Sequence, residues 1–191
     1  MKKITVVTGL CLALLVPAVA LAKATPNAGD KRAAKSECSM WRGHSHATRE
    51  AFQAKFATFK ACVKQKAAEE AQEGQNAHSN AAKECAAERA QDRDAFAEKY
   101  GTNANDRNAF GKCVSTLAKQ KEHAADEQDK QDATEFKNAA KECASERSAD
   151  ADAFKTTYGT ERSNFKNAFG KCVSKKVRED NEQPETEQPT S

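Results

Sequence analysis

The feature that most constrains this chain is a block of sequence that is repeated almost unchanged and carries a cysteine near each end. Residues 80–115 contain the runs Asn-Ala-Ala-Lys-Glu-Cys-Ala-Ala-Glu-Arg and Asn-Ala-Phe-Gly-Lys-Cys-Val-Ser, and residues 138–174 contain both again with a single substitution. A diverged copy occupies residues 37–63. Self-similarity of this kind is typical of repeated structural units. The sequence therefore predicts one small fold built three times.

Each copy is predicted to form two helices around a turn. In copy two, Cys85, Phe96 and Tyr100 fall on one stripe at helical spacing, which predicts a single first helix. Gly101 follows directly and suits the left-handed conformation that ends many helices, after which Thr102 or Asn105 can cap the next one. The second helix carries apolar residues at i, i+3, i+4 and i+7, in copy two Phe110, Cys113, Val114 and Leu117, and in copy three Phe169, Cys172, Val173 and Val177.

Large apolar side chains are scarce after residue 22, so a conventional core is not available and the chain needs covalent closure. They comprise Met40, Trp41, Phe52, Phe56, Phe59, Val63, Phe96, Tyr100, Phe110, Val114, Leu117, Phe136, Phe154, Tyr158, Phe165, Phe169, Val173 and Val177. An even set of cysteines in such a chain favours disulfides over zinc, which prefers closely spaced ligands. The set is Cys38, Cys62, Cys85, Cys113, Cys143 and Cys172.

Two disulfide connectivities are compatible with these spacings. Pairing within each repeat joins Cys38–Cys62, Cys85–Cys113 and Cys143–Cys172. Pairing across the linkers joins Cys62–Cys85 and Cys113–Cys143, with Cys38–Cys172 closing the ends. We favour pairing within repeats, because a duplicated unit should carry its own closure.

The block resembles one that occurs once or several times in exported bacterial proteins of uncharacterised function, with the pattern Cys, Phe, Tyr-Gly-Thr-Asn and Asn-Ala-Phe-Gly-Lys-Cys-Val-Ser. The match is close over residues 80–115 and 138–174 and weak over 37–63. The resemblance implies export and attaches no activity to the block.

The N-terminus has the organisation of a secretory signal peptide, residues 1–22. Lys2 and Lys3 precede an apolar run, residues 4–19, and Ala20-Leu21-Ala22 is a typical cleavage signal. We expect a secreted or periplasmic protein with no transmembrane segment after cleavage. Loss of the two lysines lowers the net charge from +3 to about +1, which argues against a nucleic-acid partner, since these binders present a basic surface.

The predicted fold class is all-α, with tandem disulfide-stapled helical hairpins joined by charged, Ala-rich helical linkers. The predicted divisions after the signal peptide are a flexible segment (23–34), diverged repeat 1 (35–66), a linker (67–79), repeat 2 (80–117), a second linker (118–137), repeat 3 (138–178) and a disordered acidic, Pro-containing tail (179–191). The linkers contain almost no large apolar residue and show no apolar face, so we expect the copies to behave as independent beads.

No residue pattern predicts catalysis, and we expect neither a catalytic residue nor a cofactor. His44 and His46 are the one close histidine pair, and a metal there would need further ligands such as His78 or Glu50. We interpret these histidines as surface residues and predict no metal site. The chain is therefore expected to be a non-enzymatic binding or structural protein with an unknown envelope or extracellular partner.

The alternative function rests on a basic amphipathic helix in copy three, which could contact anionic membrane or envelope polymers. Its apolar stripe could also pack on its own hairpin, and both interpretations remain open at this stage. The candidate contacts for an anionic surface are Arg162, Lys166, Lys171, Lys175, Lys176 and Arg178.

Overall fold

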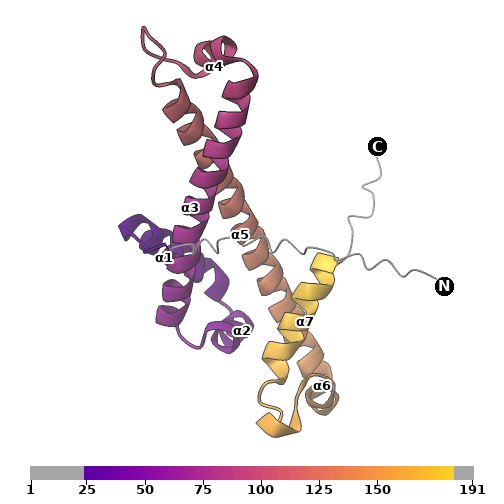
Figure 1. Ribbon diagram of the computed structural model, residues 1–191. Helices are drawn as coiled ribbons and strands as arrows, with labels where there is room; N and C mark the ends of the chain where they lie inside the picture. The colour runs from indigo at the N-terminus through magenta and orange to yellow at the C-terminus, as the bar shows by residue number, and fades with distance from the viewer. Residues whose placement is uncertain (1–23, 183–191) are drawn as a thin grey trace, which may run out of the picture.

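The computed structural model describes residues 24–182, and every regular element in that range is helical (Figure 1). The elements are α1 (Ala28–Arg42), α2 (His46–Phe56), α3 (Phe59–Gln91), α4 (Arg93–Tyr100), α5 (Ala109–Ala149), α6 (Ala151–Tyr158), the 3-10 turn η1 (Glu161–Ser163) and α7 (Ala168–Glu182). The predicted all-α fold of stapled hairpins is confirmed. The signal peptide and the tail beyond Glu182 lie outside the described residues. None of the described helices is both long enough and apolar enough to cross a membrane.

Two long antiparallel helices, α3 and α5, cross to form the frame of the molecule (Figure 1). Each belongs to two copies, because α3 carries Cys62 of copy one and Cys85 of copy two, while α5 carries Cys113 of copy two and Cys143 of copy three. The predicted linkers therefore lie inside uninterrupted helices. Their Ala, Glu, Gln and Lys residues have high helix propensity, and the one glycine, Gly74, costs only about 1 kcal/mol in a helix interior.

The disulfides join neighbouring helices within each copy, as predicted. Cys38–Cys62 joins α1 to α3, Cys85–Cys113 joins α3 to α5, and Cys143–Cys172 joins α5 to α7, each with a Cα–Cα distance of 6.0 Å. All six cysteines are fully buried. The cross-linker connectivity is thereby excluded for this structure.

The prediction of a single helix from Cys85 to Tyr100 is wrong, because the helix is interrupted at Asp92, between α3 and α4. The Asp92 carboxylate accepts hydrogen bonds from the backbone N–H groups of Asp94 and Ala95, so it ends α3 and caps α4 at once. Asp150 breaks the chain between α5 and α6 in the same way. An aspartate that satisfies the first free N–H groups of a new helix competes with continuation of the old one. The break turns α4 away and lets the two cysteines meet.

The turn that follows also differs from expectation. Gly101 has φ −68° and ψ 140°, an extended rather than a left-handed conformation. Asn108 precedes α5 and closes the loop: its Oδ1 accepts from the Thr102 backbone N–H at 3.1 Å, and its Nδ2 donates to Thr102 Oγ1 at 2.6 Å. The same pair of bonds links Thr160 and Asn167 in copy three, at 3.1 and 2.9 Å.

Copies one and three share a single hydrophobic core. Trp41 of α1 lies with its ring centre 4.9 Å from that of Phe136 in α5 and 5.8 Å from that of Phe56 in α2. The same buried cluster contains both disulfides, Cys38–Cys62 and Cys143–Cys172, together with Phe52, Phe154, Phe169 and Val173. Copies one and three therefore form one structural unit.

Copy two stands apart at the far end of the long helices, with a small core of Cys85, Phe96, Ala109 and Cys113 (Figure 1). A seam of Ala77, Ala81 and Ala118 connects it to the rest. The expectation of independent beads is wrong, since the linkers have a buried face made of alanine. Small side chains let two helices approach closely, and a search for large apolar residues does not detect such a face.

Helix α1 begins inside the segment that we expected to be flexible, residues 23–34. Asn27 accepts from the backbone N–H groups of Gly29 and Asp30, while the Asp30 carboxylate accepts from the Asn27 N–H. This reciprocal arrangement is a capping box, which satisfies donors that a helix start leaves free. It defines a sharp beginning for α1 at Ala28.

Candidate functional site

The residues that repeat between copies two and three hold each hairpin together. In copy two, the Tyr100 hydroxyl donates to Glu88 at 3.0 Å, and the Arg89 guanidinium lies 4.8 Å from the centre of the Phe110 ring. The same contacts recur in copy three, between Tyr158 and Glu146 at 2.9 Å and between Arg147 and Phe169 at 4.5 Å. The repeated block therefore encodes a hairpin, and a functional site should be sought where the copies differ.

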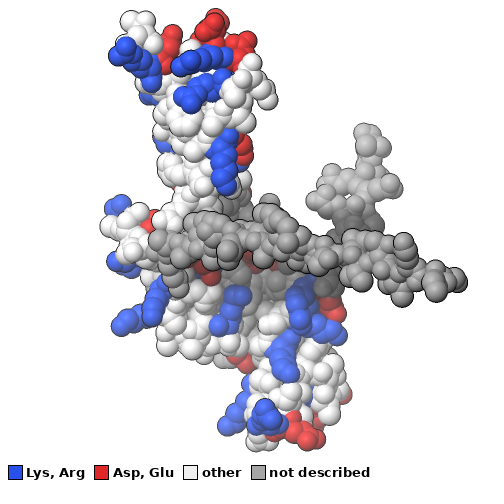
Figure 2. Space-filling view, viewed as in Figure 1, with Lys and Arg blue, Asp and Glu red and all other residues white. Residues whose placement is uncertain are grey.

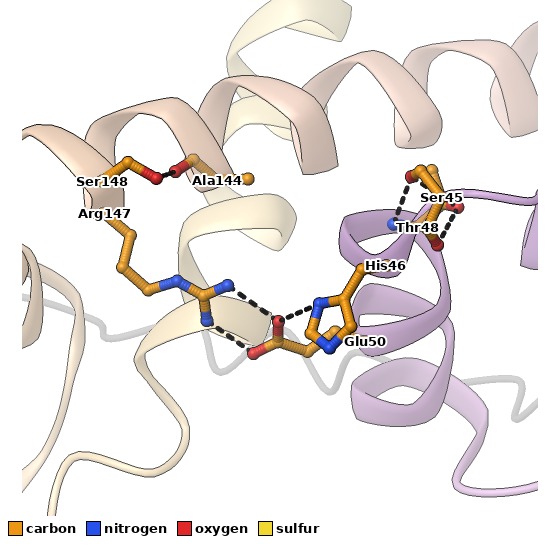
Figure 3. Close-up of polar contacts among 7 residues, drawn as sticks. All are labelled: Ser45, His46, Thr48, Glu50, Ala144, Arg147 and Ser148. Atoms are coloured by element: carbon orange, nitrogen blue, oxygen red, sulfur yellow. Dashed lines mark hydrogen bonds and ion pairs between the residues drawn. The ribbon is translucent and has the colours of Figure 1, made fainter.

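One repeated residue has an additional partner in copy three. Arg147 of α5 donates from its two terminal nitrogens to the two carboxylate oxygens of Glu50 in α2, at 2.6 and 2.9 Å (Figure 3). The hydrogen bond to Glu50 raises the pKa of Arg147. Because a bidentate arginine–carboxylate pair fixes orientation as well as distance, this contact sets how copy one docks on copy three.

The histidines considered as metal ligands are not gathered into a site. His46 lies beside Glu50, with Nδ1 3.8 Å from Oε2, and is exposed at the start of α2 (Figure 3). Within residues 24–182, the one group of potential ligands close enough to share an ion consists of Glu37, Glu70 and Asp129, and contains no histidine.

A cleft of about 550 Å³ opens next to the Arg147–Glu50 pair, between α2, α5 and α7. Lys55, Lys166 and Lys171 are the basic residues that line it, and Phe136, Phe169 and Val173 are its apolar residues. Helix α7 approaches α2 closely here, since a Cβ on Gly170 would lie 2.9 Å from that of Ala54. The cleft combines buried apolar side chains with exposed ammonium groups, an arrangement suited to an anionic ligand.

The predicted contacts for an anionic surface divide into two groups. Lys176 is engaged by Glu142 and Glu146 at 3.2 and 2.7 Å, and Lys175 lies 3.6 Å from Glu179. Arg178 donates through Nε to the Ser174 carbonyl at 3.2 Å, and Arg162 lies in η1. Lys166 and Lys171 line the cleft, so the structure brings two of the predicted residues into one site.

The apolar stripe of α7 packs on the protein itself. Phe169 and Val173 are buried in the shared core, and Val177 is half-buried, as is Phe165 in the turn before α7. Of the two interpretations of this amphipathic helix, the packed one is found. Along its described residues, α7 therefore turns its largest apolar side chains into the protein.

A second groove, of about 430 Å³, was not detected from the sequence. Phe59, Val63 and Ala67 of α3 are among its apolar residues, and the basic residues that line it are Lys31, Lys35, Lys60 and Lys64. No carboxylate of the described residues forms an ion pair with these four lysines or with the three at the first cleft. In the view of Figure 2, Lys and Arg side chains lie over the lower half, where the helices of copies one and three lie, and also at the upper end, in copy two. The spacing of four residues between Lys31 and Lys35, and between Lys60 and Lys64, was the sequence signal from which this groove could have been predicted.

Comparison with known proteins finds no match: no family model, no curated protein and no solved structure aligns significantly with the chain. The fold and the lysine-lined clefts therefore have to be interpreted from their own geometry. Three intramolecular disulfides are typical of proteins that work in an oxidising compartment.

Proposed function

We propose that the protein is a non-enzymatic binding protein, exported to the periplasm or the exterior, that holds an anionic envelope polymer at the lysine-lined clefts of copies one and three. The observation that carries this proposal is a set of seven lysines around the two clefts that form no ion pair among the described residues. They are Lys31, Lys35, Lys55, Lys60, Lys64, Lys166 and Lys171, of which Lys55 also lies 4.9 Å from the centre of the Trp41 ring.

Electrostatic attraction rather than insertion into lipid fits this surface. The net charge of the chain without residues 1–22 is close to +1. The excess of positive charge around the clefts is therefore balanced by acidic residues elsewhere in the molecule. Like charges that are not neutralised destabilise the fold that carries them, and a polyanion relieves this repulsion by replacing the missing counter-charges. Because the apolar stripe of α7 is buried, we propose contact with charged groups at the surface, with the apolar parts of the clefts contacting the polymer backbone.

Export is supported by the sequence of residues 1–22 and by the disulfides. The signal-peptide organisation predicts passage across the inner membrane, and disulfides persist in the compartments beyond it. The resemblance of the repeated block to exported bacterial proteins points in the same direction.

The proposal is tested with a labelled polyuronate and, as the neutral counterpart, a dextran of similar length. Fluorescence anisotropy at low ionic strength should show binding of the polyuronate alone, and affinity should fall steeply as salt is added. Absence of polyuronate binding at low salt contradicts the proposal. Equal binding of dextran contradicts the electrostatic basis.

Matched triple variants locate the binding surface. Lys55→Gln, Lys166→Gln and Lys171→Gln together should weaken polyuronate binding strongly, because they remove the cations of one cleft. The control carries Lys83→Gln, Lys112→Gln and Lys119→Gln, and changes the net charge by the same amount. Lys83 and Lys112 are exposed lysines of copy two, and Lys119 is exposed at the start of the second linker. Equal losses in the two variants would show that net charge, and not this cleft, determines binding.

A further inference from the structure

A cluster of carboxylates occupies the place where α1, α3 and α5 meet. Glu37 of α1, Glu70 of α3 and Asp129 of α5 each offer an oxygen, and these oxygens all lie within 4.8 Å of one another. Two oxygens that share one Ca²⁺ are at most about 5 Å apart, since each metal–oxygen distance is 2.3–2.6 Å. The three helices thus bring together ligands at the spacing that a single Ca²⁺ requires.

Glu37 is an independent indication of a ligand. Its residue surface is 3% exposed, and its Oε2 atom is buried without a hydrogen-bond partner among the described residues. Its other oxygen accepts from Trp41 Nε1 at 3.2 Å and from the Lys66 ammonium at 2.5 Å. A buried carboxylate oxygen that accepts no hydrogen bond is costly, and here Lys66 pairs with the other oxygen of the same carboxylate. This atom therefore lacks a partner in a place where two further carboxylates converge.

The surroundings of the cluster hold far more negative than positive charge. Lys66 is buried and pairs with Glu37, with Asp129 at 3.1 Å and with Glu69 at 3.1 Å. Its single charge faces several acids, because a cavity of about 220 Å³ beside the cluster is lined by the carboxylates of Asp30, Glu70, Glu73, Glu122 and Asp126 and, among the described residues, by no basic one.

We propose that Glu37, Glu70 and Asp129 bind a Ca²⁺ ion that clamps α1, α3 and α5 at their crossing. The ligands are all oxygens, which Ca²⁺ prefers, and the charge excess matches a divalent cation that Lys66 alone cannot replace. Bound water would complete the six to eight ligands that Ca²⁺ takes. We expect an affinity in the range of extracellular calcium modules, with Kd about 10⁻⁴–10⁻³ M.

The test uses the full oxidised chain after treatment with a chelator. Equilibrium dialysis with radioactive Ca²⁺ should show one ion bound per chain, and added Ca²⁺ should raise Tm because it binds the folded state. The variant Glu70→Gln/Asp129→Asn should lose this binding by roughly tenfold or more. The control Glu98→Gln/Asp180→Asn removes the same charge from two exposed acids and should bind Ca²⁺ as the natural chain does. Absence of calcium uptake, or equal uptake by both variants, overturns the proposal.

Lys66→Met provides a second measurement that does not depend on loss of a ligand. Without Lys66 the cluster has no cation of its own, so Ca²⁺ should raise the Tm of this variant more than it raises that of the natural chain. A shift in the Lys66→Met variant no larger than in the natural chain would overturn the assignment of the ion to this cluster. Failure of the polyuronate experiment leaves this result unaffected, because the two sites share no residue.

Discussion

Copies two and three carry nearly the same sequence in different surroundings. In copy three the second helix buries Phe169 and Val173 against copy one, whereas the equivalent Phe110 and Val114 of copy two are half-buried. The equivalent glycines differ as well: a Cβ on Gly170 would meet Ala54 at 2.9 Å, and one on Gly111 would meet nothing within 4 Å. The repeated residues thus determine the hairpin. Residues that do not belong to the block shared by copies two and three, such as Trp41, Glu50 and Phe136, determine which copy is docked.

The largest expected difference between the copies is in the free energy of unfolding that is lost when the equivalent phenylalanines, Phe169 and Phe110, are replaced by alanine. Phe169→Ala should destabilise the protein by about 3–5 kcal/mol, because it leaves a cavity in the shared core. Phe110→Ala should cost only about 1–2 kcal/mol, because that side chain remains partly solvated. Denaturant unfolding followed by circular dichroism measures both. Equal costs would show that copy two is buried as deeply as copy three.

Removal of one disulfide at a time should reduce hydrogen-exchange protection in a different region of the molecule for each disulfide. The loops closed by Cys85–Cys113 and Cys143–Cys172 span 28 and 29 residues, so the chain-entropy account gives about 3–4 kcal/mol for each. Cys85→Ser/Cys113→Ser should nevertheless lose hydrogen-exchange protection only around copy two. Cys143→Ser/Cys172→Ser should lose it throughout the core of copies one and three. The same protection pattern in both variants would argue against two separate cores.

Glu70 at the helix crossing and Glu88 in copy two, here called the tip, should contribute to the pH dependence of stability with opposite sign. The folded-state pKa of Glu70, about 7, lies above its ordinary value of 4.5, so stability from its neutral form is complete below about pH 4.5 and lost as pH rises through 7. In calcium-free buffer, Glu70→Gln should therefore match the natural chain at about pH 4 and exceed it by about 1–2 kcal/mol at about pH 8, after allowance for solvent screening.

Glu88 of copy two is the matched comparison. The hydrogen bond from Lys99 lowers the pKa of this carboxyl and outweighs desolvation, which raises it. The stabilising effect of Glu88 therefore exists above its unfolded pKa and is lost as pH falls through the folded one. Glu88→Gln should destabilise at neutral pH and have no effect in acid. Thermal melts over a pH series measure both variants. Parallel profiles would contradict the distinction between crossing and tip.

The smallest expected effect separates the two glycines. Gly111→Ala should stabilise the protein by about 0.5–1 kcal/mol, because alanine favours a helix interior and has free space there. Gly170→Ala should give no gain and cost about 1 kcal/mol, because its methyl group would press on Ala54. The two melting temperatures, measured at equal protein concentration, decide the matter. A gain at both positions would show that α7 and α2 can separate without cost.

Much of the fold could be predicted because the duplicated block contains the residues that form the hairpin and its disulfide. The pairing of Cys85 with Cys113 follows from their recurrence in a single unit, and the helical linkers follow from residue propensity. The break at Asp92 was missed, although aspartate followed by Arg-Asp-Ala is a plausible cap, because the apolar stripe continues across it. The alanine seam was missed because alanine in a charged segment reads as solvent-exposed helix until a second helix is known to lie beside it.

The candidate sites were harder to predict, since each joins residues far apart in the chain. Lys166 and Lys171 could be selected from the sequence as members of a basic helix, but their neighbour Lys55 in the cleft depends on the docking of copy one. Lys66 is the last residue of repeat 1 as the sequence divides it, and nothing in its local sequence indicates that it is buried. Its burial against Glu37 and Asp129 depends on three helices crossing at one place, and no local pattern encodes that crossing.

Because α5 runs without interruption from copy two into copy three, the number of residues in its linker sets the rotation of one copy relative to the other about the helix axis. Each residue inserted into 118–137 turns everything beyond it by about 100° and shifts it by about 1.5 Å. One added residue would rotate Phe136 away from Trp41 and Arg147 away from Glu50, with every side chain still present. Seven added residues would restore the direction to within about 20° while moving copy three by about 10 Å. Tolerance to insertion should therefore rise and fall with the period of the helix instead of declining steadily with length.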